Sequence, residues 1–446
     1  MKSRHVSILL VTSMRGTAEV VAQGLRKLGH KVGVIEVPGL LFRPPDQLMR
    51  QIGSAVKGYD YVILPGTYPY DLKGAGRGLL KGPEGLGLLL DIIESYGVDV
   101  LSPSEAFEKA HPDLLEGLAS RRLSELRTRT RPIPQAPPPI TVISEVPVPR
   151  AANMNYVEAA VSSMIAEGAD YVVLSPLDMS VGELRGLSGH LRGLLPGLWL
   201  GVDAGLSTLR RVAEDYDLLL SVPASSAAED LSWASSREVV VLVRDDDVKL
   251  VEAIERQAER SGARPVLDPV AMPSPMPGLA GTLARLQALK DLRLAKLIGL
   301  SNVVELMDAD TSGSVALLTS LFAELGGSAV LVEEASPKAR GLTLEARAAA
   351  DMVSLALLWG KAAKDVHVSL LNSKLKTREV SSGSVTVRMV GFSEVELKAR
   401  TGSYRLKCEG PCPLRSLPDM LDRNELAAAT IMVYRACLPW SSSWNC

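Results

Sequence analysis

The chain has 446 residues, of which 46% are hydrophobic and 22% charged, and its formal net charge is −2. This length predicts two or three domains rather than one core. The near-neutral charge argues against a nucleic-acid or anionic-membrane partner, and no apolar run approaches the ~18 residues of a spanning helix. With no signal peptide at its start, the chain is expected to be soluble and cytoplasmic.

Residues 1–127 alternate apolar runs with helical periods. Such alternation predicts a small α/β domain of the Rossmann-like or flavodoxin-like kind, with a parallel sheet covered on both faces. The glycine pattern of dinucleotide-binding proteins is missing after the first strand, where residues 12–16 read TSMRG, and this argues against a dinucleotide. The predicted strands are 8–11, 32–37 and 61–64, and the predicted helices include 16–29 and 46–57.

Residues 128–139 are rich in proline, with four prolines within six residues. Proline breaks both helices and sheet ladders, so we expect a stiff extended linker that marks a domain boundary.

Residues 140–375 form a longer series of strands separated by amphipathic helices. Eight strands with crossovers predict a (β/α)8 TIM barrel, although an open doubly wound sheet would give the same alternation. The predicted strands are 140–146, 171–174, 198–202, 218–222, 239–243, 265–267, 295–298 and 329–332.

Residues 376–446 change to short strands of period two, such as 385–390 and 395–398, followed by a predicted helix at 425–435. This pattern predicts a small α+β region. All four cysteines are here, and free thiols, disulfides and a four-thiolate zinc site are all compatible with their spacing. These are Cys408, Cys412, Cys437 and Cys446.

Polar side chains follow the predicted barrel strands, where the chemistry of such barrels takes place. Two carboxylates and an amide suit a pterin, because the pterin edge presents an amino group and a ring N–H side by side and a carboxylate can accept from both. Each residue alone also has a simpler explanation, since Asp268 precedes a proline and Asp203 and Asn302 can cap helices. The strand-end residues are Glu145, Asp203, Ser221, Asp268, Asn302 and Glu333.

Two segments carry a family resemblance. Residues 297–313 (LIGLSNVVELMDADTSG) and 333–341 (EEASPKARG) resemble the archaeal dihydropteroate synthase-related, pterin-binding family, and residues 64–66, 70–72 and 81–83 look like the motifs of its N-terminal domain. The resemblance covers most of residues 1–375. Residues 299–303 (GLSNV) are also similar to a motif of methyltetrahydrofolate corrinoid methyltransferases, which share the pterin barrel.

The resemblance implies that Asp203, Asp268 and Asn302 hold the pterin edge, with Ser221 at the position of a strand-four asparagine. The phosphate loop of true synthases is replaced by residues 175–179 (SPLDM), and their strand-seven basic motif is absent. The residues suited to a diphosphate are Ser336, Lys338 and Arg340.

A synthase-like transferase would join a hydroxymethyl-dihydropterin diphosphate to an arylamine, in folate or tetrahydromethanopterin biosynthesis. Lys338, Arg340 and Mg2+ would stabilise the leaving group. Asp308 and Asp310 are candidate catalytic residues that orient a loop or bind the metal, although helix capping explains them equally well. Glu145 is a candidate metal ligand. The resemblance also implies a homodimer.

Two other functions remain open. One is methyl transfer from a methyl-pterin, which needs a corrinoid partner and no diphosphate clamp. The other is non-catalytic pterin binding, which is favoured because the chain has few residues that are suited to bind a phosphate.

Overall fold

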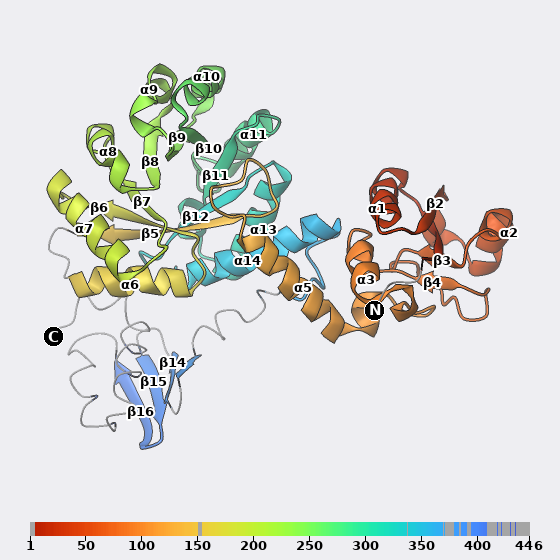
Figure 1. Ribbon diagram of the computed structural model, residues 1–446. Coiled ribbons are helices and arrows are strands. Elements are labelled where there is room, and N and C mark those ends of the chain that lie inside the picture. Colours follow the sequence, from red (N-terminus) through yellow and green to blue (C-terminus); the bar gives the residue numbers. More distant parts are fainter. Residues whose placement is uncertain are drawn as a thin grey trace. The chain divides into compact units, whose positions relative to one another are not determined.

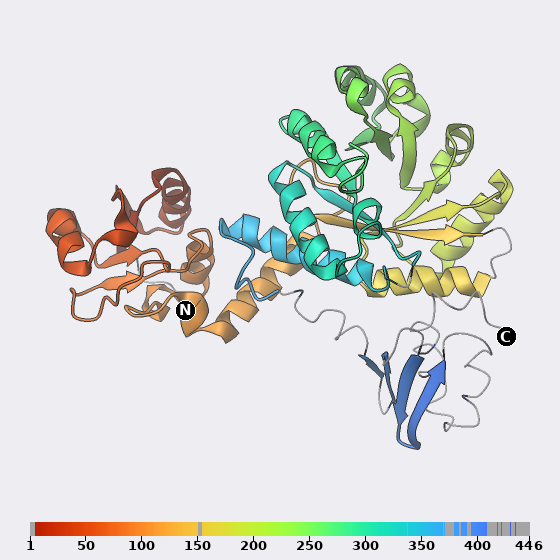
Figure 2. The same ribbon diagram turned by 180° about the vertical axis from the view of Figure 1, so that it is seen from behind.

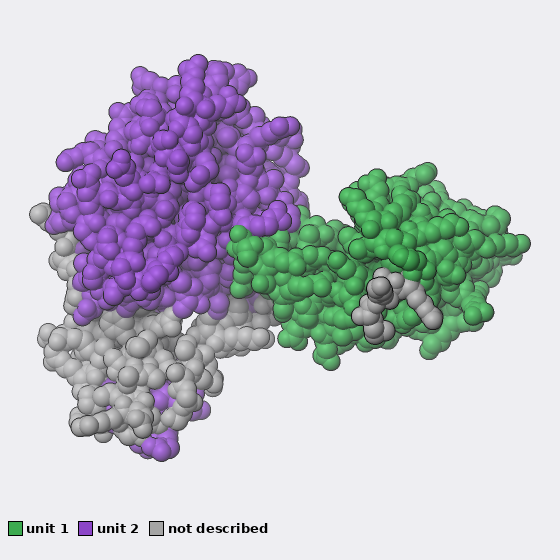
Figure 3. Space-filling model, in the orientation of Figure 1, with its two compact units in different colours: residues 1–128, 352–368 green, residues 129–351, 369–446 purple. Residues whose placement is uncertain are grey.

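The computed structural model (Figure 1) forms two compact units, namely Met1–Thr128 with Met352–Val368, and Arg129–Asp351 with Ser369–Cys446 (Figure 3). None of the helices in the described parts of the chain is both long and apolar enough to cross a membrane. The structure describes residues 5–149, 154–336, 338–368, 370, 379–382, 385–389, 394–407, 417, 421, 429 and 433.

The first unit contains a parallel four-stranded sheet in the order β2-β1-β3-β4. Alternate residues of β1 pack to opposite sides: Ile8 and Leu10 join a core with α1 and α3, whereas Leu9 and Val11 join a core with α2. The sheet is therefore covered on both faces, as its apolar strands predict, while the Rossmann-like or flavodoxin-like class stays a prediction. The elements are β1 (Ser7–Thr12), α1 (Arg15–Lys27), β2 (Lys31–Glu36), η1 (Leu40–Phe42), α2 (Pro45–Val56), β3 (Tyr61–Leu64), β4 (Leu79–Lys81), α3 (Leu88–Tyr96), η2 (Val98–Val100), α4 (Phe107–Ala110) and α5 (Pro112–Arg127).

A distant segment completes this unit. Residues 352–368, which follow the barrel in sequence, supply Leu355 and Trp359 to the core around α3. Both side chains are fully buried. The range 140–375 predicted for the barrel therefore includes residues that pack with the first unit instead.

The second unit contains a closed barrel of eight parallel strands, seen from both sides in Figures 1 and 2. The last strand, β12, pairs with the first, β5, so that Ala329 lies opposite Thr141 and Glu333 opposite Glu145. This closure excludes the open sheet. The strands are β5 (Thr141–Val148), β6 (Tyr171–Pro176), β7 (Leu200–Asp203), β8 (Leu218–Pro223), β9 (Glu238–Leu242), β10 (Arg264–Asp268), β11 (Ala295–Gly299) and β12 (Ala329–Glu333).

Period-two alternation along the strands builds two apolar layers. Inward residues such as Ile143 and Leu297 fill the barrel interior, whereas outward residues such as Val202 and Leu267 pack under the surrounding helices. The helical elements are α6 (Met154–Ala166), α7 (Val181–Leu194), α8 (Leu206–Val212), η3 (Ala213–Asp215), α9 (Ala224–Glu229), η4 (Ser232–Ala234), η5 (Asp245–Leu250), α10 (Val251–Ser261), α11 (Leu279–Leu289), α12 (Ser301–Val304), α13 (Thr311–Glu324) and α14 (Leu342–Trp359).

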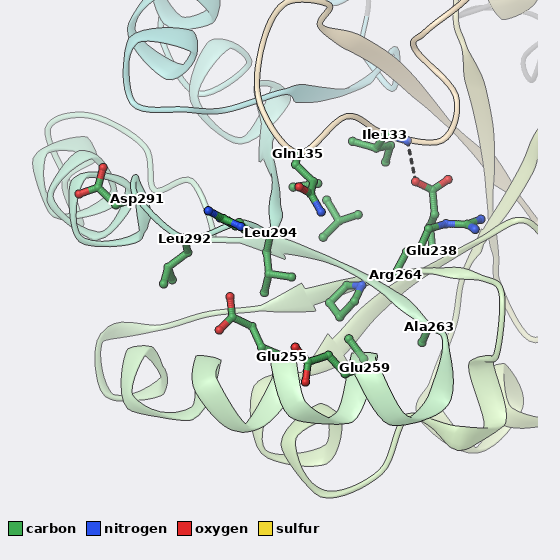
Figure 4. A pocket seen from close by; sticks show the side chains of 15 residues that line it. Ile133, Gln135, Glu238, Glu255, Glu259, Ala263, Arg264, Asp291, Leu292 and Leu294 are labelled. Atoms are coloured by element: carbon green, nitrogen blue, oxygen red, sulfur yellow. Dashed lines mark hydrogen bonds between the residues drawn. The ribbon is translucent and has the colours of Figure 1, made fainter.

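The segment predicted as a linker closes the amino-terminal end of the barrel. Ile133 packs into the interior core, and its backbone N–H donates a 2.7 Å hydrogen bond to Glu238 Oε1 at the start of β9. The Tyr171 hydroxyl donates to the other oxygen of this buried carboxyl group. Beside Glu238 lies a groove of about 570 Å³, into which Glu255 and Glu259 point from α10 (Figure 4).

The last part of the chain forms an antiparallel sheet in the order β13-β14-β15-β16. The two strands predicted from period-two alternation are confirmed as β14 (Val385–Met389) and β15 (Glu394–Ala399), which β13 (Glu379–Ser382) and β16 (Gly402–Lys407) flank. The four cysteines and most of the predicted helix at 425–435 lie outside the described residues.

Candidate functional site

Four acidic side chains occupy inward positions at the carboxyl ends of the barrel strands. Val202 and Leu267 face outward, so the residues that follow them, Asp203 and Asp268, face the interior. The same alternation turns Glu145 inward on β5, two residues after Ile143, and Glu333 inward opposite it. We call these four side chains the acidic ring: Glu145, Asp203, Asp268 and Glu333.

Ser221 is connected to the acidic ring by a hydrogen bond. Its hydroxyl donates to Asp203 Oδ2 at 3.0 Å. The backbone of Ser221 is left-handed, with φ of 71°, next to an irregular register between β8 and β9. Burial raises the pKa of Asp203, and the bond from Ser221 acts in the opposite direction.

Asp268 is 8% exposed, and its Oδ1 accepts a 2.8 Å bond from the backbone N–H of Val270. Burial raises its pKa to about 6, and the negative charge of Asp203 contributes. The loop that carries Val270 is held by Arg285 of α11, whose Nε donates to the Pro269 carbonyl at 3.0 Å. Sequence reasoning missed Arg285, because a basic residue on a helix face gives no sign of a bond to a distant loop.

Glu145 has a strongly raised pKa. Burial, together with the charges of Asp203 and Glu333, raises its pKa to about 7, and a side-chain bond with Ser175 acts in the opposite direction. Ser175 takes the inward position at the end of β6, two residues after Val173. The sequence alone identified its segment only as a departure from a family motif.

Glu333 closes the acidic ring beside β11. Its backbone N–H donates a 2.7 Å bond to the hydroxyl of Ser301, which ties the start of α12 to the end of β12. Burial raises the pKa of Glu333, and the charge of Glu305 adds to this effect. All four carboxyl groups of the ring have raised pKa values, because burial favours their neutral forms, and neighbouring acids add to this effect in Glu145, Asp268 and Glu333.

Asn302 lies in the short helix α12, directly after β11. A Cβ atom at Gly299 would come within 3.0 Å of Asn302 Nδ2, so the amide group lies over the backbone of Gly299. Gly299 has the inward position at the end of β11, two residues after Leu297. The amide is thus at the same end of the barrel as the acidic ring.

The three residues predicted to bind a diphosphate have protein contacts. Lys338 Nζ donates a 2.8 Å bond to the Val304 carbonyl, and the Ser336 hydroxyl donates to Glu305 at 3.2 Å. Arg340 lines a pocket of about 90 Å³ together with Glu145 and two further glutamates. The diphosphate-binding role of these three residues stays a prediction.

Asp308 and Asp310 are exposed in the segment between α12 and α13. Asp310 is at the N-cap position of α13 but makes no side-chain bond to that helix. Within the described residues, no group of three or more His, Cys, Asp or Glu side chains could hold a metal ion. The predicted metal roles of Glu145 and the two aspartates stay predictions.

Comparisons with known proteins gave one sequence relative and several structural ones. No protein-family model matches the chain. An uncharacterized protein of Methanocaldococcus jannaschii is 22% identical over 417 residues, which is 85% of this chain and 79% of that protein.

The structural neighbours each match about half of the chain. DHPS of Yersinia pestis, solved with a pterine-sulfa conjugate, has a TM-score of 0.38 and 17% identity over 49% of this chain and 93% of its own. A dihydropteroate synthase of Coxiella burnetii in complex with pteroic acid has a TM-score of 0.36 and 16% identity over 49% of this chain and 93% of its own. The dihydropteroate synthase of Xanthomonas albilineans in complex with 7,8-dihydropteroate has a TM-score of 0.35 and 18% identity over 48% of this chain and 91% of its own.

Proposed function

We propose that the carboxyl-terminal mouth of the barrel binds the hydrogen-bond donor edge of a pterin. The observation that carries this proposal is the pair formed by Asp203 and Asp268. Each carboxyl group already has one oxygen engaged by a protein donor, from Ser221 and from the Val270 N–H. The remaining oxygens are acceptors at the end of an apolar barrel, and a ligand with two adjacent N–H donors matches them.

The raised pKa values support the same ligand. Asp268, with a pKa of about 6, and its neighbour Asp203 repel each other when both are ionised. A ligand that donates hydrogen bonds to both carboxylates offsets this repulsion. A pterin does so with its 2-amino group and ring N–H, and Asn302 adds an amide donor and acceptor for the rest of the ring edge.

The reaction proposed for this site is a transfer at the pterin, as in a dihydropteroate synthase-like enzyme. The nitrogen of an arylamine forms a bond to the pterin's methylene carbon while the bond from that carbon to the diphosphate oxygen breaks. The amine then loses a proton, for which Glu145 is the proposed acceptor because a base works best with a pKa near the operating pH. The described residues contain no ready metal site, so we assign no step to Mg2+.

A second function is favoured by the contacts of the residues that were predicted to bind a diphosphate. Lys338 and Ser336 donate to Val304 and Glu305, and the acidic ring repels an anion. A pterin without a diphosphate fits these charges better, either in methyl transfer with a corrinoid partner or in binding without chemistry.

Calorimetric titration of the full chain separates these functions. The titrants are 6-hydroxymethyl-dihydropterin diphosphate and plain 6-hydroxymethyl-dihydropterin, each with and without Mg2+. Asp268→Asn is the test variant, and Asp291→Asn is the matched control, because Asp291 is an exposed aspartate on the loop before β11, at the opposite end of the barrel.

Magnesium-dependent binding of the diphosphate that Asp268→Asn loses and Asp291→Asn keeps would support the synthase function. Equal binding of both pterins, indifferent to Mg2+, would support the second function. Failure of both pterins to bind would overturn the pterin proposal itself.

A further inference from the structure

Near its carboxyl end, β8 contains one residue more than the stretch of β9 with which it pairs. Leu219 lies opposite Val239, but Val222 lies opposite Val241, so three steps along β8 correspond to two along β9. An extra residue of this kind is a β-bulge, which redirects a side chain and often occurs next to a functional site.

The bulge changes the direction of Ser221. Leu220 packs inside the barrel, so strict alternation would turn the next residue outward. Instead Val222 packs outside with the helices, and Ser221 bonds to Asp203, which faces inward. The bulge therefore adds a hydroxyl group to the acidic ring.

The backbone of Ser221 is held in an unfavourable conformation. Its φ of 71° is in the left-handed region, which costs a non-glycine residue roughly 1 kcal/mol or more. Val270, which donates to Asp268, has φ of 56° and carries a β-branched side chain, for which this region is rarer still. The two residues that donate to the two aspartates, Ser221 and Val270, therefore both have a strained, left-handed backbone conformation.

We propose that Ser221 is a positioning residue whose hydroxyl fixes the orientation of Asp203, so that the mouth offers a ligand one oxygen from Asp203 and one from Asp268. This proposal rests on the proposed pterin site and adds a rule for its selectivity. The ligand has to present two donors, one for each carboxyl group. A pterin satisfies the rule, whereas a lumazine, with an oxo group in place of the 2-amino group, directs an acceptor at a carboxylate.

The test variant is Ser221→Gly, since glycine adopts φ of 71° without strain and lacks the side chain that carries the hydroxyl. Ser236→Gly is the matched control, because Ser236 also has a left-handed φ, of 62°, but lies just before β9 at the opposite end of the barrel. Ser221→Asn is the rescue variant, since asparagine tolerates this backbone and carries a donor.

Binding of 6-hydroxymethyl-dihydropterin and of the matching lumazine to the full chain is measured by calorimetry. Ser221→Gly is expected to lower the ratio of pterin affinity to lumazine affinity by about tenfold. This change corresponds to the free energy of one hydrogen bond to a charged group. Ser236→Gly keeps the ratio, and Ser221→Asn restores part of it. A purely structural role would lower thermal stability and leave the ratio unchanged.

Crystal structures of the ligand-free wild type and Ser221→Gly give a second measurement that does not depend on binding. The Asp203 carboxyl group is expected to turn once its hydroxyl partner is lost. An unchanged Asp203 orientation, or an unchanged selectivity ratio in a protein that binds pterin, would overturn the proposal. If the wild type binds no pterin, the proposed function fails, and the orientation of Asp203 alone decides the role of Ser221.

Discussion

The indole N–H of Trp359 donates a 2.9 Å hydrogen bond to Asp91 Oδ2, across 268 residues of sequence. Arg122 donates to both oxygens of the same carboxyl group, so a buried aspartate joins α3, α5 and the end of α14 within the first unit. This contact explains why Met352–Val368 belongs with that unit.

Removal of the Asp91 carboxyl group is expected to destabilise the first unit. Asp91→Ala leaves the Arg122 guanidinium and the Trp359 N–H without their acceptor, and we expect a loss of about 3 kcal/mol in the free energy of unfolding. Trp359→Phe removes one donor only and should cost about 1 kcal/mol through the bond, with any packing loss added. Urea denaturation followed by circular dichroism measures both. Equal stability of Asp91→Ala and the control Tyr96→Phe would contradict this role for Asp91.

Glu145 is expected to make stability decrease as pH rises. Its pKa is about 7 in the folded protein and 4.5 ordinarily, so the folded state keeps a proton that the unfolded chain releases. Between about pH 4.5 and 7 the unfolded state binds fewer protons, and the free energy of unfolding falls through this window and is level above it. Asp268, with a pKa of about 6, adds to the same trend.

Glu145→Gln removes the contribution of Glu145 to this dependence. At pH 8 the variant should be more stable than the wild type by roughly 1–3 kcal/mol, and the difference should vanish near pH 4. Thermal melts at both pH values measure it, with the exposed Glu252→Gln as the control. A wild-type stability that rises from pH 5 to pH 7, with no change in Glu145→Gln, would show that Glu145 does not retain its proton in the folded state.

Tyr171 is expected to contribute more to stability than an equally buried tyrosine whose partner is a backbone carbonyl. The Tyr171 hydroxyl donates to the buried Glu238 carboxyl group, whereas Tyr216 donates to the Leu184 carbonyl at 2.8 Å. We expect a loss of about 2 kcal/mol for Tyr171→Phe and about 1 kcal/mol for Tyr216→Phe, because the first change leaves a buried carboxyl group without one of its donors. Chemical denaturation compares the two, and a larger effect at Tyr216 would refute the assignment.

Lys338 distinguishes the two proposed functions. If its bond to the Val304 carbonyl is its role, Lys338→Met lowers the free energy of unfolding by about 1 kcal/mol and leaves the affinity for a plain pterin unchanged. If it binds a diphosphate, the affinity for the diphosphate falls tenfold or more. Calorimetry with both ligands decides between these outcomes.

The barrel could be predicted from the sequence because its strands are apolar on both faces. Runs such as Tyr171–Leu174 are buried between the interior core and the outer helices, and this double burial leaves a continuous apolar pattern. The inward direction of Asp203 and Asp268 follows from the same period of two. The expectation of carboxyl groups at one end of the barrel therefore needed no long-range information.

Other features depend on contacts between distant residues. The bulge at Ser221 adds a residue that no local pattern marks, and the bond from Lys338 to Val304 joins groups 34 residues apart. The return of Trp359 to the first unit was invisible because α14 continues without a break through Asp351 and Met352, where the two units divide. Sequence periodicity predicts which side chains are buried, but it does not say against which partner.

The dependence of the first unit on Met352–Val368 imposes a delay during protein synthesis. About 220 residues separate the two parts of that unit, and a ribosome that adds roughly 5–20 residues per second needs roughly 10–45 seconds to make them. Throughout this time Leu88 and Ile92 of α3 lack the cover of Leu355 and Trp359. The nascent first unit therefore exposes an apolar surface while the whole barrel is translated, and exposed apolar surface of this kind makes an unfinished chain prone to aggregation.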